Sequence, residues 1–392
     1  MAKIILADRN KASVTELADC LKKLRPDWHT VALDSGMDAL TRVKTQDFDC
    51  VIAKMQLADM PGADLLRILQ TESPDIARLT LTCPTEQVER MQEGSASNHR
   101  LIDRSLPDEA LVNAIDSALR LQHMLSDSDL KRLLKNIQSL PAVPTVYHEL
   151  VEELSAPNSS LQRVGTIIEA DTALTATVLK MVNNAFYGLS QRVESVAQAV
   201  ALLGAHMIKN ATLTAKVFMH FEASDVEMTN LRQINDRANR TGALCNHFAR
   251  LAHSPKAVID HAQMAGMMCD IGKLVQMLPD TQDNTFKSDL LGARLLSNWL
   301  MPDPVVEAIA MQNEPLDRTA NGVTPTQILQ AICYLEKCLP DATDDTARQA
   351  CFDVLAQSLD KVLVERWIDT YTDLQLLTSH NNVNDGDASM VA

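Results

Sequence analysis

Cys50-Val51-Ile52-Ala53 is a short apolar run that ends at a charged residue, Lys54. It fits a strand buried on both faces, because such a strand shows no alternation of apolar and polar residues. Comparable runs occur at 3–7, 79–82 and 100–102, with a weaker one at 30–33. Helical patterns fall between them, near 11–24, 36–46, 62–72, 85–93 and 107–122. Strands that alternate with helices predict an α/β domain with a doubly wound, parallel, five-stranded sheet.

The pattern changes near residue 123. From about 128 to 379 almost all apolar residues recur at helical spacing, and 128–315 contains no strand-like alternation. The second domain is therefore predicted to be all-α. The expected division is a first domain over 1–122, a helical linker over 123–132, a helical domain over 133–335, a helical extension over 336–379 and a disordered polar tail over 380–392.

Composition excludes several classes of protein. The net charge of -15 opposes binding to nucleic acid, because phosphates need a basic surface. No apolar stretch approaches the length needed to span a bilayer, and the apolar run near the N-terminus is too short for a secretory signal. The eight cysteines form no C-x-x-C pair and are expected to be reduced, buried thiols. These features favour a cytoplasmic protein without nucleic-acid or membrane partners.

The residues that follow the Cys50–Ala53 run resemble those of a known protein family. Residues 53–66 read Ala-Lys-Met-Gln-Leu-Ala-Asp-Met-Pro-Gly-Ala-Asp-Leu-Leu. This stretch resembles the sequence around the phospho-acceptor aspartate in receiver domains of two-component response regulators. The resemblance covers 1–122 in the order of its elements. Aligned without gaps, it places Lys54 at the acceptor position and Gly62 at the family's glycine.

The other pocket positions of that family are also altered. Of the acidic pair that helps to hold Mg²⁺, Asp8 remains and Arg9 replaces the second acid. Thr82 fits the family's hydroxyl position, and Arg104 stands where the family has lysine. Receiver phosphorylation needs a carboxylate nucleophile and oxygen ligands for a hard cation. The resemblance therefore implies a pseudo-receiver that is not phosphorylated. Lys54 is expected to pair with Asp8, and a lysine that extends into solvent is the alternative.

Four segments of the helical region carry a second resemblance. They are Ser139-Leu140-Pro141-Ala142-Val143-Pro144, the stretch 168–174, the stretch 179–188 and the stretch 199–204. In this order and at this spacing they resemble the signature of HDOD domains, helical relatives of HD-type phosphohydrolases. The signature residues are Asp171, Asn183, Asn184, Phe186 and Tyr187. Each has an expected structural role, with the aspartate as a helix cap or turn residue, the asparagines bonded to backbone groups where a helix ends, and the aromatic residues in the core.

The metal-binding positions of HD-type hydrolases are altered here. Those enzymes use histidine and aspartate to hold metals that activate a water. The corresponding residues of this chain are Cys269, Asp270, Gln312 and Asn313. Only the aspartate remains, so the resemblance implies that no metal is bound. Asp270 is expected to cap a helix or pair with Lys273. Zinc held by His247 and Cys269 is the alternative.

Together these patterns predict a non-enzymatic signalling regulator with no cofactor. The first domain would be an input that works without phosphorylation, and the HDOD domain would be an output that binds a protein. A nucleotide is a second candidate ligand for that domain, and a homodimer is left open. The alternative function is a metal-dependent phosphohydrolase of a nucleotide second messenger. Two amphipathic helices that meet near Ser126-Asp127-Ser128-Asp129 are expected to relay the state of one domain to the other.

Overall fold

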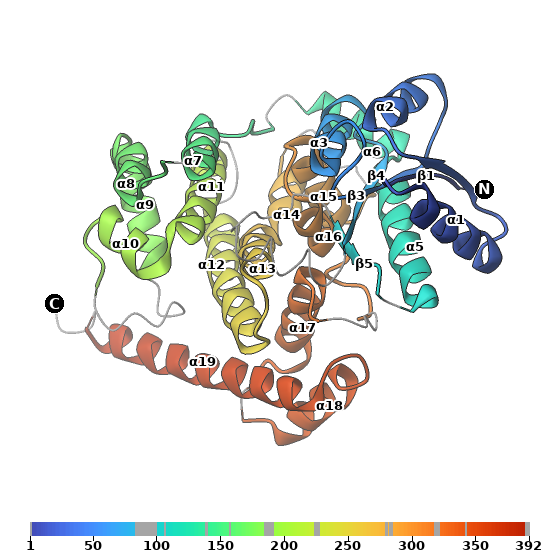
Figure 1. Ribbon diagram of the computed structural model, residues 1–392. Helices are drawn as coiled ribbons and strands as arrows, with labels where there is room; N and C mark the ends of the chain where they lie inside the picture. Colours follow the sequence, from blue (N-terminus) through green and yellow to red (C-terminus); the bar gives the residue numbers. More distant parts are fainter. Residues whose placement is uncertain are drawn as a thin grey trace.

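A computed structural model of the chain describes residues 2–82, 100–105, 107–137, 140–156, 158–183, 192–222, 228–278, 281, 285–316, 322–341 and 343–388. It contains an α/β part and a larger helical part, which lie side by side in Figure 1. The α/β part includes the N-terminus and the helical part forms the remainder. The predicted fold class is therefore confirmed. The helix predicted near 85–93 lies outside the described residues.

The first domain is a five-stranded parallel sheet with strand order β2-β1-β3-β4-β5. Its strands are β1 (Lys3–Ala7), β2 (His29–Leu33), β3 (Cys50–Lys54), β4 (Ala77–Thr82) and β5 (Arg100–Asp103). Its described helices are α1 (Lys11–Leu24), α2 (Gly36–Thr45), α3 (Gly62–Glu72) and α5 (Asp108–Leu125). These bounds agree closely with the periods seen in the sequence, because each strand is a compact apolar run with polar ends.

Alternate residues of the central strands supply two separate apolar layers. Ile4 and Leu6 of β1 pack in a cluster with residues of α1 and α5. Ile5 and Ala7 of the same strand pack in another cluster with residues of α2 and α3. Successive side chains of a strand point to opposite faces, so this division covers the sheet on both sides. The carboxyl ends of the strands, where polar residues follow the apolar runs, are left at one edge of the sheet.

One helix connects the cores of the two domains. Leu111 and Ile115 of α5 belong to the apolar cluster of the sheet, whereas Leu125 at its end belongs to the main helical cluster. The next helix is α6 (Ser128–Asn136), and Asp127 caps it by accepting hydrogen bonds from the backbone N–H groups of Asp129 and Leu130. The helix predicted to end at 122 thus continues to Leu125, and the break falls within the expected Ser126–Asp129 segment.

The helical domain has two apolar cores. The smaller is formed mainly by α7 (Thr145–Ser155), α8 (Leu161–Glu169), α9 (Thr172–Val182), α10 (Val196–Leu203) and α11 (Ala205–Glu222). The larger involves α12 (Met228–Leu251), α13 (Lys256–Met268), α14 (Ile271–Gln276), α15 (Ser288–Asn298), α16 (Asp303–Ala310), α17 (Pro325–Cys338), α18 (Asp345–Leu355) and α19 (Lys361–Ala388). Side chains of α11 contribute to both cores, so this helix joins the two helical lobes.

The C-terminal helix differs from its prediction. α19 continues to Ala388, whereas disorder was expected from residue 380. The residues after 380 include glycine and asparagine, which disfavour a helix, but no proline, the residue that would break one that begins upstream. No helix within the described residues is long and apolar enough to cross a membrane.

Candidate functional site

Two of the predicted pocket residues meet where the strands of the sheet end. Asp8 directly follows β1 and Lys54 ends β3, its neighbour in the sheet. Lys54 Nζ lies 3.7 Å from Asp8 Oδ2, so the expected ion pair is present. Asp8 is buried, and its Oδ1 also accepts a hydrogen bond from the backbone N–H of Asn10. An ammonium group therefore stands beside the one carboxylate that the pocket retains.

The other pocket positions fill the same edge of the sheet. Thr82 ends β4 and is buried, and its hydroxyl donates a hydrogen bond to the backbone oxygen of Ile102. Arg104 follows β5, and its Nη1 lies 3.6 Å from Asp108 at the start of α5. Arg9 is exposed. This edge presents three basic side chains, those of Arg9, Lys54 and Arg104.

Gly62 fixes the position of Lys54. It begins α3, and a Cβ atom added there would lie 1.9 Å from the backbone oxygen of Lys54. Only glycine lets the helix approach this closely. The resulting arrangement holds Lys54 against Asp8. It does not suit a magnesium ion, which needs several oxygen ligands and would meet the ammonium group.

Two of the HDOD signature residues have the structural roles expected for them. Asp171 is the N-cap of α9 and accepts a hydrogen bond from the backbone N–H of Leu174, and Lys216 of α11 pairs with it at 2.5 Å. The Lys216 ammonium group holds the pKa of Asp171 below its usual range. Asn183 ends α9 and exchanges two hydrogen bonds with the backbone of Val193. Asn184, Phe186 and Tyr187 lie outside the described residues.

Asp270 is the centre of the candidate site in the helical domain. It lies between α13 and α14, and only 4% of the residue is exposed. Its Oδ1 is 2.9 Å from Lys273 Nζ, which is the pairing predicted from the sequence. Its Oδ2 is 2.5 Å from Nη1 of Arg237, a residue of α12 that the sequence did not single out. The buried carboxylate thus already has two cationic partners.

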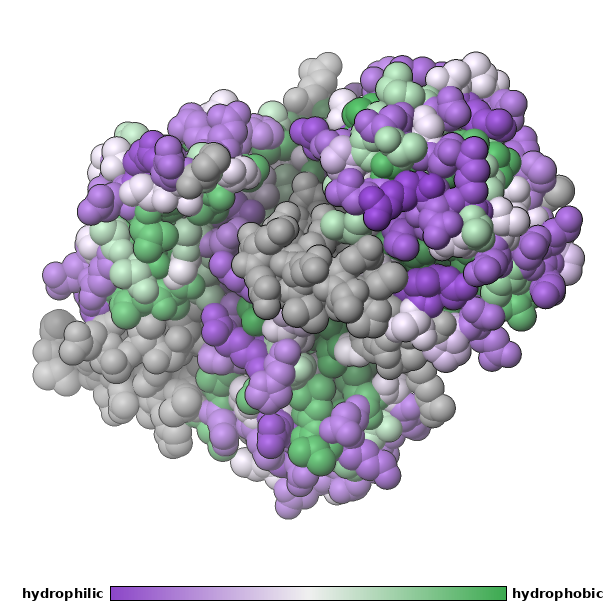
Figure 2. All heavy atoms as spheres, viewed as in Figure 1, coloured by the Kyte–Doolittle hydropathy of each residue, from purple (hydrophilic) through white to green (hydrophobic). Residues whose placement is uncertain are grey.

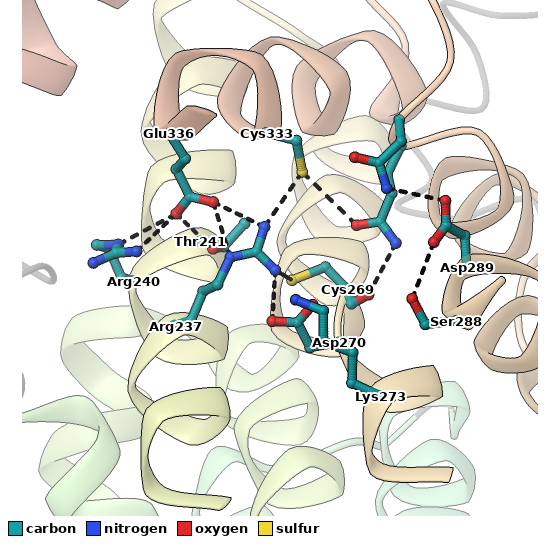
Figure 3. Close-up of polar contacts among 12 residues, drawn as sticks. Arg237, Arg240, Thr241, Cys269, Asp270, Lys273, Ser288, Asp289, Cys333 and Glu336 are labelled. Atoms are coloured by element: carbon teal, nitrogen blue, oxygen red, sulfur yellow. Dashed lines mark hydrogen bonds and ion pairs between the residues drawn. The ribbon is translucent and has the colours of Figure 1, made fainter. Parts of the chain in front are cut away.

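The guanidinium group of Arg237 links three helices (Figure 3). Its Nε and Nη2 contact Glu336 Oε2 of α17 at 2.9 and 2.8 Å. Nη1 and Nη2 also donate to the thiols of Cys269 and Cys333, each at 3.6 Å. Arg240 reinforces the arrangement with a 3.0 Å contact to Glu336 Oε1. One planar cation therefore pairs with two carboxylates and donates to two sulfur atoms, which uses the fork geometry of arginine.

Electrostatics keep the cation charged and the thiols neutral. Burial opposes the charge on Arg237, but the nearby acidic groups, including Glu336 and Asp270, outweigh it and raise the pKa of Arg237. Burial raises the pKa of Cys333 to about 12 and that of Cys269 well above its usual value. Both thiols are therefore neutral at pH 7 and contact Arg237 in their protonated form.

The two residues that replace histidines point to different partners. Gln312 is buried, donates through Nε2 to the backbone oxygen of Cys269 at 2.9 Å and accepts from the Cys333 thiol at 3.7 Å. Asn313 is exposed and donates to Asp289 at 3.0 Å. The structure therefore brings Cys269, Asp270 and Gln312 together and places Asn313 beside them.

A shallow pocket of about 450 Å³ opens beside Arg237 and Asp270. Its walls come from α12, from Asp270 and from α14 with the residue that follows it, and they mix polar and apolar surface. The lining residues are Asn230, Gln233, Ile234, Arg237, Asp270, Lys273, Gln276 and Met277. Arg237 and Lys273 are partly exposed at this opening, whereas Asp270 lies buried behind them.

A metal ion does not fit this arrangement. The space beside Asp270 that a metal would need holds the Arg237 guanidinium, at ion-pair distance. Within the described ranges, no group of three or more His, Cys, Asp or Glu side chains could hold a metal ion, so His247 and Cys269 share no such group. Sequence reasoning missed Arg237 and Glu336 because they lie far from Asp270 in the chain. The spacing of Arg237, Arg240 and Thr241 on one helix face was the only local signal.

Comparisons with known proteins place both domains. The family model of the response regulator receiver domain matches residues 4–116, and that of the HDOD domain matches residues 140–287. An uncharacterized protein of Treponema pallidum (strain Nichols) is 24% identical over 195 residues, which are 44% of this chain and 37% of that protein. The uncharacterized protein YuxH of Bacillus subtilis (strain 168) is 43% identical over 63 residues, which are 16% of this chain and 15% of that protein. The chain thus spans well under half the length of these two relatives.

Solved structures are similar to each part. An HDOD domain protein of unknown function from Geobacter sulfurreducens has 17% identity and a TM-score of 0.46, covering 62% of this chain and 92% of that one. The signal receiver domain of an HD domain-containing protein from Pseudomonas fluorescens Pf-5 has 22% identity and a TM-score of 0.28, covering 31% and 89%. The chain therefore joins a response regulator receiver domain to an HDOD domain, the architecture of a signalling regulator.

Proposed function

We propose that this protein is a non-enzymatic signalling regulator whose receiver domain acts without phosphorylation and whose HDOD domain acts by binding a protein. The observation that carries the proposal is the Arg237 guanidinium, 2.5 Å from Asp270. The guanidinium group of Arg237 thus supplies the positive charge beside Asp270 that a metal ion would otherwise supply. Removing Arg237 from Asp270 to admit a metal would also separate it from Glu336, which leaves a second buried carboxylate without its closest partner.

The receiver domain supports the same proposal with a second built-in cation. The Lys54 ammonium lies beside buried Asp8, as Arg237 lies beside Asp270. A lysine cannot form an acyl phosphate, and among the residues that the structure describes no other carboxylate lies within ion-pair distance of Lys54. The receiver would then report the binding of a partner and not the arrival of a phosphoryl group.

Exposed apolar side chains favour a protein as the ligand of the HDOD domain. Leu161 at the start of α8 and Leu202 near the end of α10 are each more than half exposed. The outer side of α10 adds Ala197 and Ala201. Figure 2 shows hydrophobic side chains gathered on this lobe, at the left of the view. Apolar groups that gather on a surface in this way are characteristic of contact sites for other proteins.

The purified full-length protein is expected to show no phosphatase or phosphodiesterase turnover and no stoichiometric transition metal. The reason is that Cys269, Gln312 and Asn313 stand where the hydrolase pattern has histidines, and that the Arg237 guanidinium lies beside Asp270. Elemental analysis and assays with nucleotide substrates in the presence of added Mn²⁺ check this. About one metal per chain that is lost in Asp270→Ala, together with turnover, would contradict the proposal.

The receiver domain is expected to remain unmodified by small phosphodonors. Intact mass spectrometry after incubation with Mg²⁺ and acetyl phosphate measures the result. Lys54→Asp is also expected to stay unmodified, because Asp8 would still lack its acidic neighbour at Arg9. A stoichiometric, hydroxylamine-labile phosphate on the wild-type chain would show that the acceptor lies elsewhere.

A further inference from the structure

A buried ion pair joins the two domains where the strands of the receiver sheet begin. Arg78 is the second residue of β4, and its Nη2 lies 2.8 Å from Oδ1 of Asp303, the first residue of α16. Its Nη1 donates to the backbone oxygens of Ile76 at 2.9 Å and Pro74 at 3.3 Å. Only 5% of the Arg78 side chain is exposed. Asp303 is therefore the counterion of a buried charge across the domain boundary.

A second polar contact lies beside the first. Asp75 pairs with Lys131 of α6 at 2.6 Å and with Arg294 of α15 at 3.5 Å. Its Oδ1 also accepts a hydrogen bond from the hydroxyl of Ser126, which lies between α5 and α6. Only 9% of the Arg294 side chain is exposed, and burial lowers its pKa. The Asp75 carboxylate thus pairs with two cations, Lys131 and Arg294, and also accepts a hydrogen bond from Ser126 in the segment that connects the domains.

The HDOD side of this contact contains a strained residue. Leu300 follows α15 with φ of 56°, a left-handed conformation that suits glycine. Its backbone N–H and that of Met301 bond back to Ser297 and Leu296, the pattern of a helix end that normally has glycine at this position. Its carbonyl oxygen accepts a hydrogen bond from Gln70 of α3 at 3.4 Å. The backbone that meets the receiver domain is therefore held in an unfavourable state.

Several features give this contact a small net stability. The Nε atoms of Arg78 and Arg294 are buried without a hydrogen-bond partner among the described residues. The desolvation of buried charges offsets much of their attraction. Apart from Leu121 and Leu125 of α5, which pack in the HDOD cluster, these contacts between the domains are polar. Polar interfaces of this kind permit relative motion of domains.

We propose that Asp75, Arg78, Arg294 and Asp303 form a polar latch that opens and closes, and that the receiver domain controls the HDOD domain through the state of this latch. The control of the HDOD domain by the receiver domain rests on the proposed regulatory function. When the latch is closed, it holds the HDOD domain against the receiver sheet. When it opens, α5 and α6 are the remaining connection, and both arginines return to water.

The test compares matched variants of the full-length chain. Asp75→Asn with Asp303→Asn removes both receiver–HDOD counterions. The control, Asp64→Asn with Asp353→Asn, makes the same charge change in each domain away from the boundary. Cleavage before Asp127 by an Asp-specific protease is expected to become about tenfold faster in the latch variant, because cleavage follows the population of the open form. The radius of gyration of the latch variant, from small-angle X-ray scattering, is also expected to rise. The control variant is expected to match the wild type in both the cleavage rate and the radius of gyration.

Exchanging the charges of Arg78 and Asp303 distinguishes opening of the latch from a general loss of stability. Asp303→Arg alone should open the latch by placing two cations together. Adding Arg78→Asp should restore protection of the connection, which a general loss of stability would not do. Wild-type cleavage and scattering in both the Asn variant and Asp303→Arg would overturn the proposal. Failure of the exchange to restore protection would overturn it too. Neither readout depends on turnover or bound metal, so this inference and the proposed function can fail separately.

Discussion

Replacing Arg237 by methionine is expected to lower the free energy of unfolding by about 3 kcal/mol. Methionine keeps much of the apolar stem and removes the cation between Asp270 and Glu336. Lys273 and Arg240 remain as partners, which keeps the expected loss at the lower end for a broken buried pair. Urea unfolding followed by circular dichroism measures the change.

Two further variants show whether the loss comes from unpaired charge. Asp270→Asn added to Arg237→Met should recover part of the lost stability, because it removes one of the stranded carboxylates. Arg132→Met is the matched control, since Arg132 is largely exposed and pairs with Asp129 at 2.8 Å. A surface pair of this kind contributes about 0–1 kcal/mol. An Arg237→Met effect no larger than the control would mean that the buried network does not stabilise the HDOD domain.

Trp367→Ala is expected to lower the free energy of unfolding by about 4 kcal/mol. Trp367 of α19 is fully buried, stacks on Phe248 of α12 with ring centroids 4.7 Å apart, and donates to the Phe248 backbone oxygen at 3.0 Å. The mutation would leave a large cavity and remove one of the two hydrogen bonds to the Phe248 backbone oxygen, which would keep the bond from the Ala252 N–H. Thermal or urea unfolding of the full-length chain measures it.

Val362→Ala, on the same helix, is the control for that prediction. Val362 is 58% exposed, so its truncation should change stability by less than about 0.5 kcal/mol. A small effect of Trp367→Ala would show that α19 is only loosely attached. The expected large effect would make residues 336–379 part of the HDOD core and not an appendage to it.

The receiver fold could be predicted from local patterns because its strands are short apolar runs with polar ends. That same pattern brought Asp8, Lys54 and Thr82 to one edge, since the carboxyl ends of parallel strands share an edge. The helical order of the HDOD domain was equally clear. Its bounds were less so, because a helix such as α19 continues through polar sequence that contains glycine and asparagine but no proline.

The candidate site was predicted only in part. Cys269, Asp270 and Gln312 came from a resemblance, and the structure brings them together. Arg237 and Glu336 could not be found in the same way, because arginine and glutamate on a helix usually face solvent, and the spacing that places Arg237, Arg240 and Thr241 on one helix face is too common to mark buried partners. The latch was also hidden from the sequence, since Asp75 and Arg78 look like ordinary loop and strand-start residues.

The shared helix α5 limits how this protein can be divided into fragments. A receiver fragment that stops at residue 116, where the family match ends, would cut α5 in its middle and omit Ala118. An HDOD fragment that starts at residue 140 would lack Leu130, Leu134 and Ile137, all buried in its core. Fragments and chimeras are better joined at Ser126–Asp127, where both helices are complete and the Asp127 cap is kept with the helix that it begins.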